Sequence, residues 1–130
     1  MECPTPHSPP LRTGDSVKHY MSLAEGPFEA LKSGPKRIEL RLLDEKRRQL
    51  SFGDIIIFSK LPDRAESIAV KVIGLSRAKR FEQIIRMVDP INMGFERGTA
   101  VEDMCKQMRR YYSKKEEESN GVLGIHICQL

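Results

Sequence analysis

The residues best suited to chemistry stand close together in the first third of the chain, at Lys36, Glu39 and Arg41. Lysine and arginine can hold a phosphate group or a base acceptor, the first as a point charge and the second as a planar fork of donors. A carboxylate between them can accept a base amino group, and it can also act as a general base. These residue types therefore indicate binding of nucleic acid or a nucleotide, with hydrolysis as the alternative.

These residues fall in a segment, 36–43, that alternates between apolar and polar positions. A period of two is typical of a strand with one buried face. The alternation places Glu39 and Arg41 on the polar face, whereas Lys36 at the start of the strand can turn to either side. The alternative is an ordinary set of cross-strand ion pairs on an outer face, which contributes little to stability. The apolar face consists of Ile38, Leu40 and Leu42.

A second group of charges follows this strand. Arg47 and Arg48 stand in a basic turn behind Asp44 and Lys46. Because such a turn can hold a phosphate backbone by charge, we expect Arg47 and Arg48 to supply outer charge to the site. The alternative is a solvated turn that Asp44 caps, with one of the two arginines folded back onto Asp44 or Glu39.

The charge of the chain is concentrated around these residues. Residues 32–48 hold seven lysines and arginines against three acidic residues, an excess that equals the net charge of +4 of the whole chain. A mild excess of this size also occurs in ordinary soluble proteins, so its position is more informative than its total.

The remaining candidate groups are less specific. His19 alternates with apolar neighbours, which favours a core histidine over a cleft residue that titrates near neutral pH. Tyr111 and Tyr112 follow two arginines and could stack on unpaired bases, although Tyr112 is better placed to complete the core. The cysteines and histidines are too scattered for a metal site, and no phosphate-binding glycine motif is present. We therefore expect neither a metal nor a cofactor.

The composition fits one small domain. Of 130 residues, 39% are hydrophobic and 31% are charged, which is enough apolar material for a compact core. No apolar run approaches the roughly 18 residues that a membrane-spanning helix needs, and the first residues lack the pattern of a secretory signal. We therefore expect a cytoplasmic protein with no membrane partner, whose oligomeric state the sequence does not indicate.

Proline and apolar periodicity divide the chain into a tail and a folded part. Four of the first ten residues are proline, which blocks helix and central-strand pairing, so we expect 1–16 to be a disordered tail and 17–130 to be one domain. Strands are predicted for 17–23, 36–43, 54–59, 68–75 and 122–128, and helices for 25–33, 81–88 and 100–112. Thr99 is expected to cap the last helix, and 114–118 to be a solvated charged segment. This order favours an α+β fold, with helices outside a small curved sheet or β-barrel whose strands we expect to be antiparallel.

Several stretches of the chain resemble the ASCH domain family. They are H-Y-M-S-L at 19–23, G-x-K-x-x-E-x-R at 34–41, G-D at 53–54 and G-V-L-G-I at 121–125. The G-x-K-x-x-E-x-R segment, followed by G-D, is the most specific part. The resemblance covers about residues 17–128.

The resemblance implies a PUA-like β-barrel flanked by helices, and an RNA-binding cleft beside the G-x-K-x-x-E-x-R segment. Some members of the family resemble ribonucleases, and one branch hydrolyses N4-acetylcytidine with a lysine, a threonine and a downstream glutamate. Lys36 matches that lysine, but Glu39 stands at the threonine position, which removes the hydroxyl and argues against this activity. The position of the downstream glutamate is not fixed by the sequence.

We therefore expect a protein that binds RNA or a modified nucleoside or nucleotide in a basic cleft between Lys36, Glu39 and Arg41. The first alternative is a hydrolase of the same fold, a ribonuclease or an acylated-cytidine amidohydrolase, in which Lys36 activates a water and Glu39 is the base. The second alternative is a protein-interaction module that binds no nucleic acid.

Overall fold

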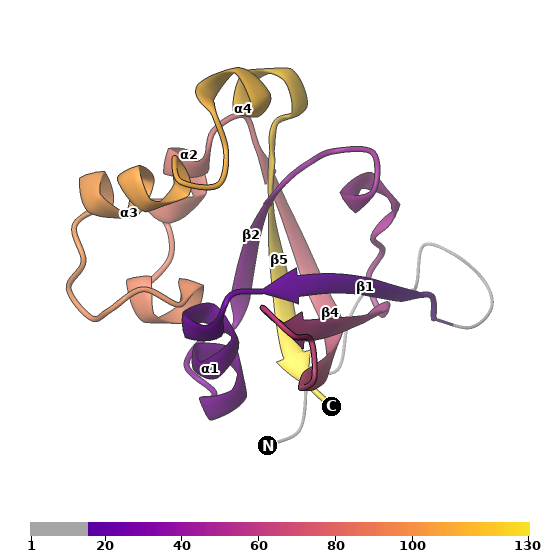
Figure 1. Ribbon diagram of the computed structural model, residues 1–130. Helices are drawn as coiled ribbons and strands as arrows, with labels where there is room; N and C mark the ends of the chain where they lie inside the picture. Colours follow the sequence, from indigo (N-terminus) through magenta and orange to yellow (C-terminus); the bar gives the residue numbers. More distant parts are fainter. Residues whose placement is uncertain (1–15) are drawn as a thin grey trace.

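The computed structural model describes residues 16–130 and shows a mixed fold of strands and helices (Figure 1). The expected tail, 1–16, lies outside the described residues except for its last position. None of the helices in the described part of the chain is long and apolar enough to cross a membrane. In chain order the elements are β1 (Lys18–Leu23), α1 (Glu25–Ser33), β2 (Ile38–Leu42), the 3-10 helix η1 (Arg47–Gln49), β3 (Ile55–Lys60), β4 (Ser67–Ala78), α2 (Phe81–Ile85), the 3-10 helix η2 (Pro90–Met93), α3 (Val101–Met108), α4 (Lys114–Asn120) and β5 (Val122–Gln129).

The five strands form one sheet in the order β1-β3-β4-β5-β2. The sheet curls into a half-barrel, so that β1 runs across the direction of β2 and β5 (Figure 1). A register shift between Val72 and Gly74 marks a bulge in the long strand β4, and bulges of this kind bend a strand. The predicted α+β fold with a small curved sheet and helices outside it is confirmed. The pairing of β1 with β3 is parallel, however, and only the other three pairs have the expected antiparallel direction.

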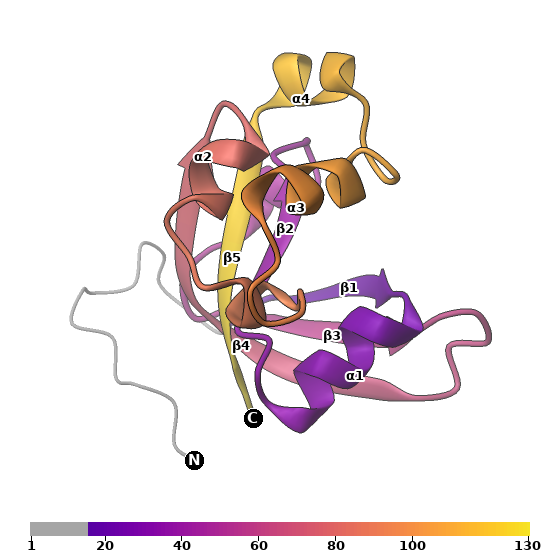
Figure 2. The same ribbon diagram turned by 90° about the vertical axis from the view of Figure 1, so that its left-hand side faces the viewer.

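Each face of the curled sheet has its own hydrophobic core. The inner core joins Phe28 of α1 to Phe58 of β3. The outer core joins Leu40 of β2 to Phe81 of α2 and Met104 of α3. Figure 2 shows the two sets of helices on their separate sides, with α1 beside β1 and β3, and with α2 and α3 beside β2 and β5. Strand β5 contributes residues to both cores, whereas the apolar residues of β2 all belong to the outer core.

The helix expected over 100–112 is shorter than predicted. It spans Val101–Met108, and its N-cap is Ala100 rather than Thr99. The hydroxyl of Thr99 instead donates to the carbonyl of Glu96 at 2.6 Å. The Thr99 side chain thus closes the loop before the helix, and the expected capping box is wrong.

The segment expected to be a solvated charged stretch is the helix α4. Ser113 caps it by accepting from the N–H of Glu116 at 3.1 Å, and the carboxylate of Glu116 accepts from the N–H of Ser113 at 3.0 Å. Glu117 turns inward, is only 3% exposed and accepts from the backbone N–H of Phe81 at 2.9 Å. The K-K-E-E-E run therefore contains one buried carboxylate that ties α4 to α2.

Candidate functional site

The strand that carries the candidate residues is aimed by the turn before it. Helix α1 ends at Gly34, whose φ of 109° lies in the left-handed region that glycine adopts without strain. Two backbone hydrogen bonds then fix the start of β2. The N–H of Lys36 donates to the carbonyl of Ala30 at 3.1 Å, and the N–H of Arg37 donates to the carbonyl of Asn92 at 2.7 Å. The chain is thereby held against the loop that contains η2.

The ammonium of Lys36 is buried and fully hydrogen-bonded. Its Nζ atom donates to the carbonyls of Ile38 at 2.9 Å and Met93 at 3.0 Å, and it lies 3.0 Å from Oε1 of Glu39. A lysine has three donors, so all of them are used. The side chain is only 3% exposed. Lys36 therefore faces inward and acts as a structural cation at the start of β2.

Glu39 is held between two cations. Its Oε1 atom faces Lys36, and its Oε2 atom accepts from Nε of Arg41 at 2.6 Å. Burial alone would raise the pKa of this carboxyl, but the charges of Lys36 and Arg41 outweigh it and lower the pKa below its usual value. Glu39 is therefore an anion at neutral pH, with both oxygens engaged.

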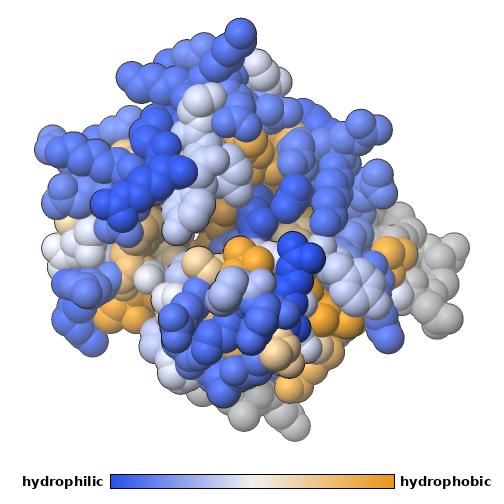
Figure 3. All heavy atoms as spheres, viewed as in Figure 1, coloured by the Kyte–Doolittle hydropathy of each residue, from blue (hydrophilic) through white to orange (hydrophobic). Residues whose placement is uncertain are grey.

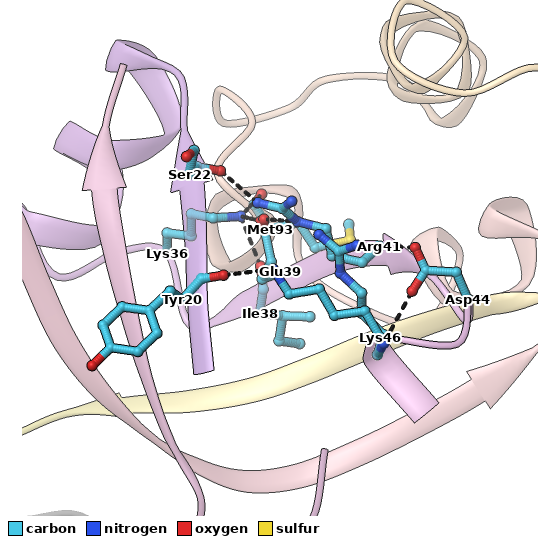
Figure 4. A network of polar contacts seen from close by, with 10 residues as sticks. Tyr20, Ser22, Lys36, Ile38, Glu39, Arg41, Asp44, Lys46 and Met93 are labelled. Carbon is cyan, nitrogen blue, oxygen red and sulfur yellow. Dashed lines mark hydrogen bonds and ion pairs between the residues drawn. The ribbon is translucent and has the colours of Figure 1, made fainter. Parts of the chain in front are cut away.

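Arg41 connects this network to the opposite edge of the sheet. Besides its contact with Glu39, it donates from Nη2 to the backbone carbonyl of Ser22 at 2.7 Å. Its side chain is 13% exposed, more than that of either partner in the network. Figure 4 shows Lys36, Glu39 and Arg41 side by side, with Ser22 at one end of the row and Asp44 at the other. The polar face that the alternation predicted is therefore real, but most of it is buried.

The basic turn after β2 splits its arginines between two places. Asp44 accepts from the backbone N–H of Arg47 at 3.0 Å and from its Nη1 atom at 2.9 Å, so Arg47 is folded back onto the turn. The Nε atom of Arg47 is buried without a hydrogen-bond partner. Arg48 is exposed and donates to the backbone carbonyl of Asn120 at 3.3 Å. The structure thus brings Arg47 to the network and leaves Arg48 at its margin, beside the end of α4.

Tyr112 was expected to complete the core, with stacking on unpaired bases as the alternative. Its ring does stack on Phe81, with centroids 5.4 Å apart. Burial raises the pKa of its hydroxyl, and among the charges that act on this pKa those of Arg41 and Glu39 have the largest effect. The ring therefore completes the outer core, as expected.

His19 lies in the same strand as Ser22 but takes no part in the network. Its Nε2 atom lies 2.8 Å from Oδ2 of Asp54, and the two side chains are 9% and 1% exposed. This arrangement agrees with the expected core histidine. Within residues 16–130, no group of three or more His, Cys, Asp or Glu side chains is arranged to hold a metal ion.

The molecular surface is hollowed beside the network. Figure 3 shows the hollow near the centre of the face, over β2 and between β1 and the layer of α2, α3 and α4. Strongly hydrophilic side chains stand around it (Figure 3). Of the three residues of the network, Arg41 has the most exposed side chain, and Lys36 and Glu39 are more deeply buried.

Comparison with known proteins gives one family and two similar structures. A model of the ASCH domain matches residues 21–129. The crystal structure of the hypothetical protein PH0355 has a TM-score of 0.77 and 35% identity, over 88% of this chain and 100% of that one. The solution NMR structure of protein PF0455 from Pyrococcus furiosus has a TM-score of 0.68 and 30% identity, over 88% of this chain and 98% of that one. No curated protein matches the sequence at a significant level.

Proposed function

The chain belongs to the ASCH domain family, and on this premise we propose that it binds RNA or a nucleotide in the hollow over β2. The family has a PUA-like fold and a general association with RNA binding. The observation that carries the proposal is the cationic network beside the hollow, in which Lys36 and Arg41 share the single carboxylate of Glu39. A phosphate group is the complement that such an excess of positive charge favours.

The charge balance supports an anionic ligand. The network and the adjoining turn contain three largely buried cations, which are paired with the two carboxylates of Glu39 and Asp44. A cation removed from water is unfavourable unless an anion or hydrogen bonds compensate it. Three positive charges therefore share two paired carboxylates, an excess that an anionic ligand would balance.

The residues have different roles in this proposal. Arg41 contacts the ligand, because its side chain is the most exposed of the three. Lys36 and Glu39 position Arg41 through a buried chain of contacts. Arg47 adds charge from the turn, and Arg48 adds charge at the outer margin.

The engagement of the two candidate catalytic groups favours binding over hydrolysis. Lys36 has an acceptor for each of its three donors, and each oxygen of Glu39 faces a cation. A general base needs contact with the proton that it removes, and neither group is free to approach a ligand in this arrangement. The protein thus holds its ligand without a base directed at it.

The experiment is a titration of fluorescent single-stranded and structured RNA into the protein, followed by anisotropy at several salt concentrations. We expect Arg41→Gln to weaken binding about tenfold or more and to reduce the salt slope by about 1. The matched control is Lys79→Gln, because Lys79 is exposed just before α2 and its side chain makes no hydrogen bond or ion pair to another described residue. This control removes the same charge and should change the affinity by less than about twofold.

Three results would contradict the proposal. Equal affinity of the wild type and Arg41→Gln for RNA would show that the ligand does not bind at Arg41 in the hollow. The absence of any salt-dependent binding of RNA or nucleotides would favour the alternative function, a protein-interaction module. New product after overnight incubation, lost in Lys36→Ala, would identify a hydrolase.

A further inference from the structure

A row of three aromatic rings leads from the outer core to the surface just after α3. Phe81, which is only 2% exposed, stacks on Tyr112 with the ring centroids 5.4 Å apart. Tyr112 in turn lies beside Tyr111, with the centroids 6.4 Å apart and the ring planes tilted by 51°. The ring of Tyr111 ends the row and is 62% exposed. An exposed aromatic ring is therefore supported by two rings that lie deeper in the fold.

Hydrogen bonds fix the backbone around this exposed ring. The N–H groups of Tyr111 and Tyr112 both donate to the carbonyl of Met108, at 3.1 and 3.0 Å. Directly after them, Ser113 and Glu116 close the cap of α4 through their reciprocal hydrogen bonds. A contact surface that is held in place before binding loses little conformational entropy when a ligand arrives. The turn therefore presents the ring of Tyr111 as a preformed surface.

The segment around Tyr111 is strongly basic. Residues 106–115 hold five lysines and arginines and no acidic residue. Arg110, Lys114 and Lys115 are exposed, and their side chains make no hydrogen bond or ion pair to another residue of the described part of the chain. The exposed ring thus stands among cations that are free to contact an anionic ligand.

The three glutamates that follow, at 116–118, are directed elsewhere. The first closes the cap of α4, and the second is buried against Arg109. The third lines a cavity of about 380 Å³ between α2, α3 and α4. Arg110, Tyr111 and Lys115 do not line this cavity. The ring and these two cations therefore belong to a surface of their own.

This surface lies on the same side of the molecule as the hollow. In Figure 2 the segment that joins α3 to α4 projects beyond β2 on the side to which β1 also extends. Figure 3 views the molecule from that side, and the hollow opens there. A strand of RNA that contacts Arg41 in the hollow can therefore continue over the turn after α3.

The chemistry of the surface favours an unpaired stretch of RNA over other occupants. A base stacks on an aromatic ring through its face, which neighbouring base pairs cover within a duplex. Cations beside the ring attract the phosphates that link successive bases. A protein interface also uses exposed tyrosines, but it is depleted of lysine. Lys114 and Lys115, close to the ring in the chain, therefore argue for nucleic acid.

We propose that Tyr111 is a stacking platform for an unpaired base and that Arg110 and Lys115 contact the adjoining phosphates, so that the ligand is single-stranded RNA or the unpaired loop of a folded RNA. This inference rests on the proposed function and names the ligand class of that site. It extends the binding surface from Arg41 in the hollow to the turn between α3 and α4.

The first part of the test compares unpaired with paired RNA. Anisotropy measures the affinity of the wild type, Tyr111→Ala and Tyr111→Phe for one RNA sequence, as a single strand and annealed to its complement. Tyr111→Ala should weaken single-strand binding about fivefold or more and duplex binding by less than about twofold. Tyr111→Phe keeps the ring and should stay within about twofold of the wild type for both.

The matched control for the ring is Tyr20→Ala. Tyr20 is exposed to the same extent, 61%, and its ring points away from Lys36, Glu39 and Arg41 (Figure 4). This variant should change the single-strand affinity by less than about twofold. The thermal midpoint of each variant confirms that it is folded.

Two further measurements address stacking and charge directly. A single strand that carries the fluorescent base 2-aminopurine, placed at each position in turn, should be quenched on binding at one or more positions. Saturating amounts of Tyr111→Phe should reproduce this quenching, and Tyr111→Ala should lose it. Arg110→Gln and Lys115→Gln should each reduce the salt slope of single-strand binding by about 0.7, whereas the charge-matched Lys79→Gln should leave it unchanged.

The outcomes separate this inference from the proposed function. Equal single-strand affinity of the wild type and Tyr111→Ala overturns the stacking platform and favours a protein partner at this surface, while a loss of affinity in Arg41→Gln still supports the proposed function. Equal losses for single strand and duplex, or in Tyr111→Ala and Tyr20→Ala, also overturn the platform. A wild type that binds nucleotides but no RNA overturns the platform alone, and one that binds neither overturns the proposed function itself.

Discussion

Arg41 joins the two open edges of the curled sheet, because its Nη2 atom donates to the backbone carbonyl of Ser22 at 2.7 Å. Arg41 lies on β2 and Ser22 on β1, the two outer strands of the sheet order. Lys46, just after β2, repeats the arrangement by donating to the carbonyl of Tyr20 at 2.7 Å. Two cationic side chains thus donate to backbone carbonyls at the open edge of β1, which pairs with no strand on that side. This closure also sets the position of Arg41 beside the hollow.

The first prediction concerns this closure. Arg41→Gln should lower the free energy of unfolding by about 3 kcal/mol, since it leaves Glu39 with only one of its two cations in a buried place. Hydrogen exchange should become faster at the amides through which β1 pairs with β3. Urea unfolding measures the first effect, and amide exchange followed by NMR measures the second.

Lys46→Gln provides the matched control for this prediction. Lys46 also donates to an edge carbonyl of β1, but its side chain is exposed. Its removal should cost less than about 1 kcal/mol. Equal losses of unfolding free energy in the two variants would mean that the buried contact of Arg41 with Glu39 adds nothing to the stability of the fold.

The second prediction concerns acid. Because the pKa of Glu39 is lower in the folded protein than its ordinary value of 4.5, the folded state binds the proton less tightly than the unfolded state does. The stabilisation from this carboxylate is therefore complete at pH values well above 4.5. It is lost as the pH falls from there through the folded pKa. Unfolding free energies measured from pH 7 downwards should show this loss in the wild type.

Glu39→Gln tests the assignment of that acid response. The variant should be less stable at pH 7 by about 3–5 kcal/mol, because it leaves two buried cations without their anion. The difference between the variant and the wild type should narrow as the pH falls below 4.5. A difference that stays constant with pH would assign the acid response to other carboxylates.

The third prediction concerns the buried carboxylate of α4. Glu117 accepts from the backbone N–H of Phe81 at 2.9 Å and lies 2.5 Å from Nη1 of Arg109. Glu117→Ala should cost about 2–3 kcal/mol, because it leaves a buried N–H and a cation without their acceptor. Glu118→Ala, on the exposed side of the same helix, should cost less than about 0.5 kcal/mol. Thermal unfolding of both variants measures the two losses of stability. Similar thermal midpoints for the two variants would refute a structural role for Glu117.

The sheet was predictable because its strands have strong local signals. The alternation in 36–43 predicted β2 and its polar face, and the apolar run near Ile56 predicted β3. The direction of β1 was not predictable, since a strand has the same residue pattern whether its neighbour runs parallel or antiparallel. Helix α4 was missed because its run of charges is typical of a solvated segment, and only tertiary packing distinguishes Glu117 from the glutamates beside it.

The sequence indicated which residues lie together in the candidate site, but it did not indicate that their side chains are buried. Spacing placed Glu39 and Arg41 on one face, which the structure confirms. The acceptors that hold Lys36 are mainly backbone carbonyls, one of them at Met93, far along the chain. Backbone carbonyls carry no signal in the residue types, so the sequence could not show that the ammonium of Lys36 is already satisfied.

The last prediction concerns the close approach of Gly94 to Lys36. Gly94 has a φ of 91°, and a Cβ atom there would lie 3.1 Å from Cδ of Lys36. Three acceptors hold the ammonium of Lys36, so the side chain cannot move aside without losing a contact. Gly94→Ala should therefore cost about 2 kcal/mol, from backbone strain and crowding together. Gly26→Ala, in the first turn of α1 with no neighbour within 4 Å of the added Cβ, should be neutral or stabilise by up to about 1 kcal/mol. Urea unfolding of the pair measures the contrast, and equal stability of the two variants would show that the ammonium of Lys36 is not fixed by its acceptors.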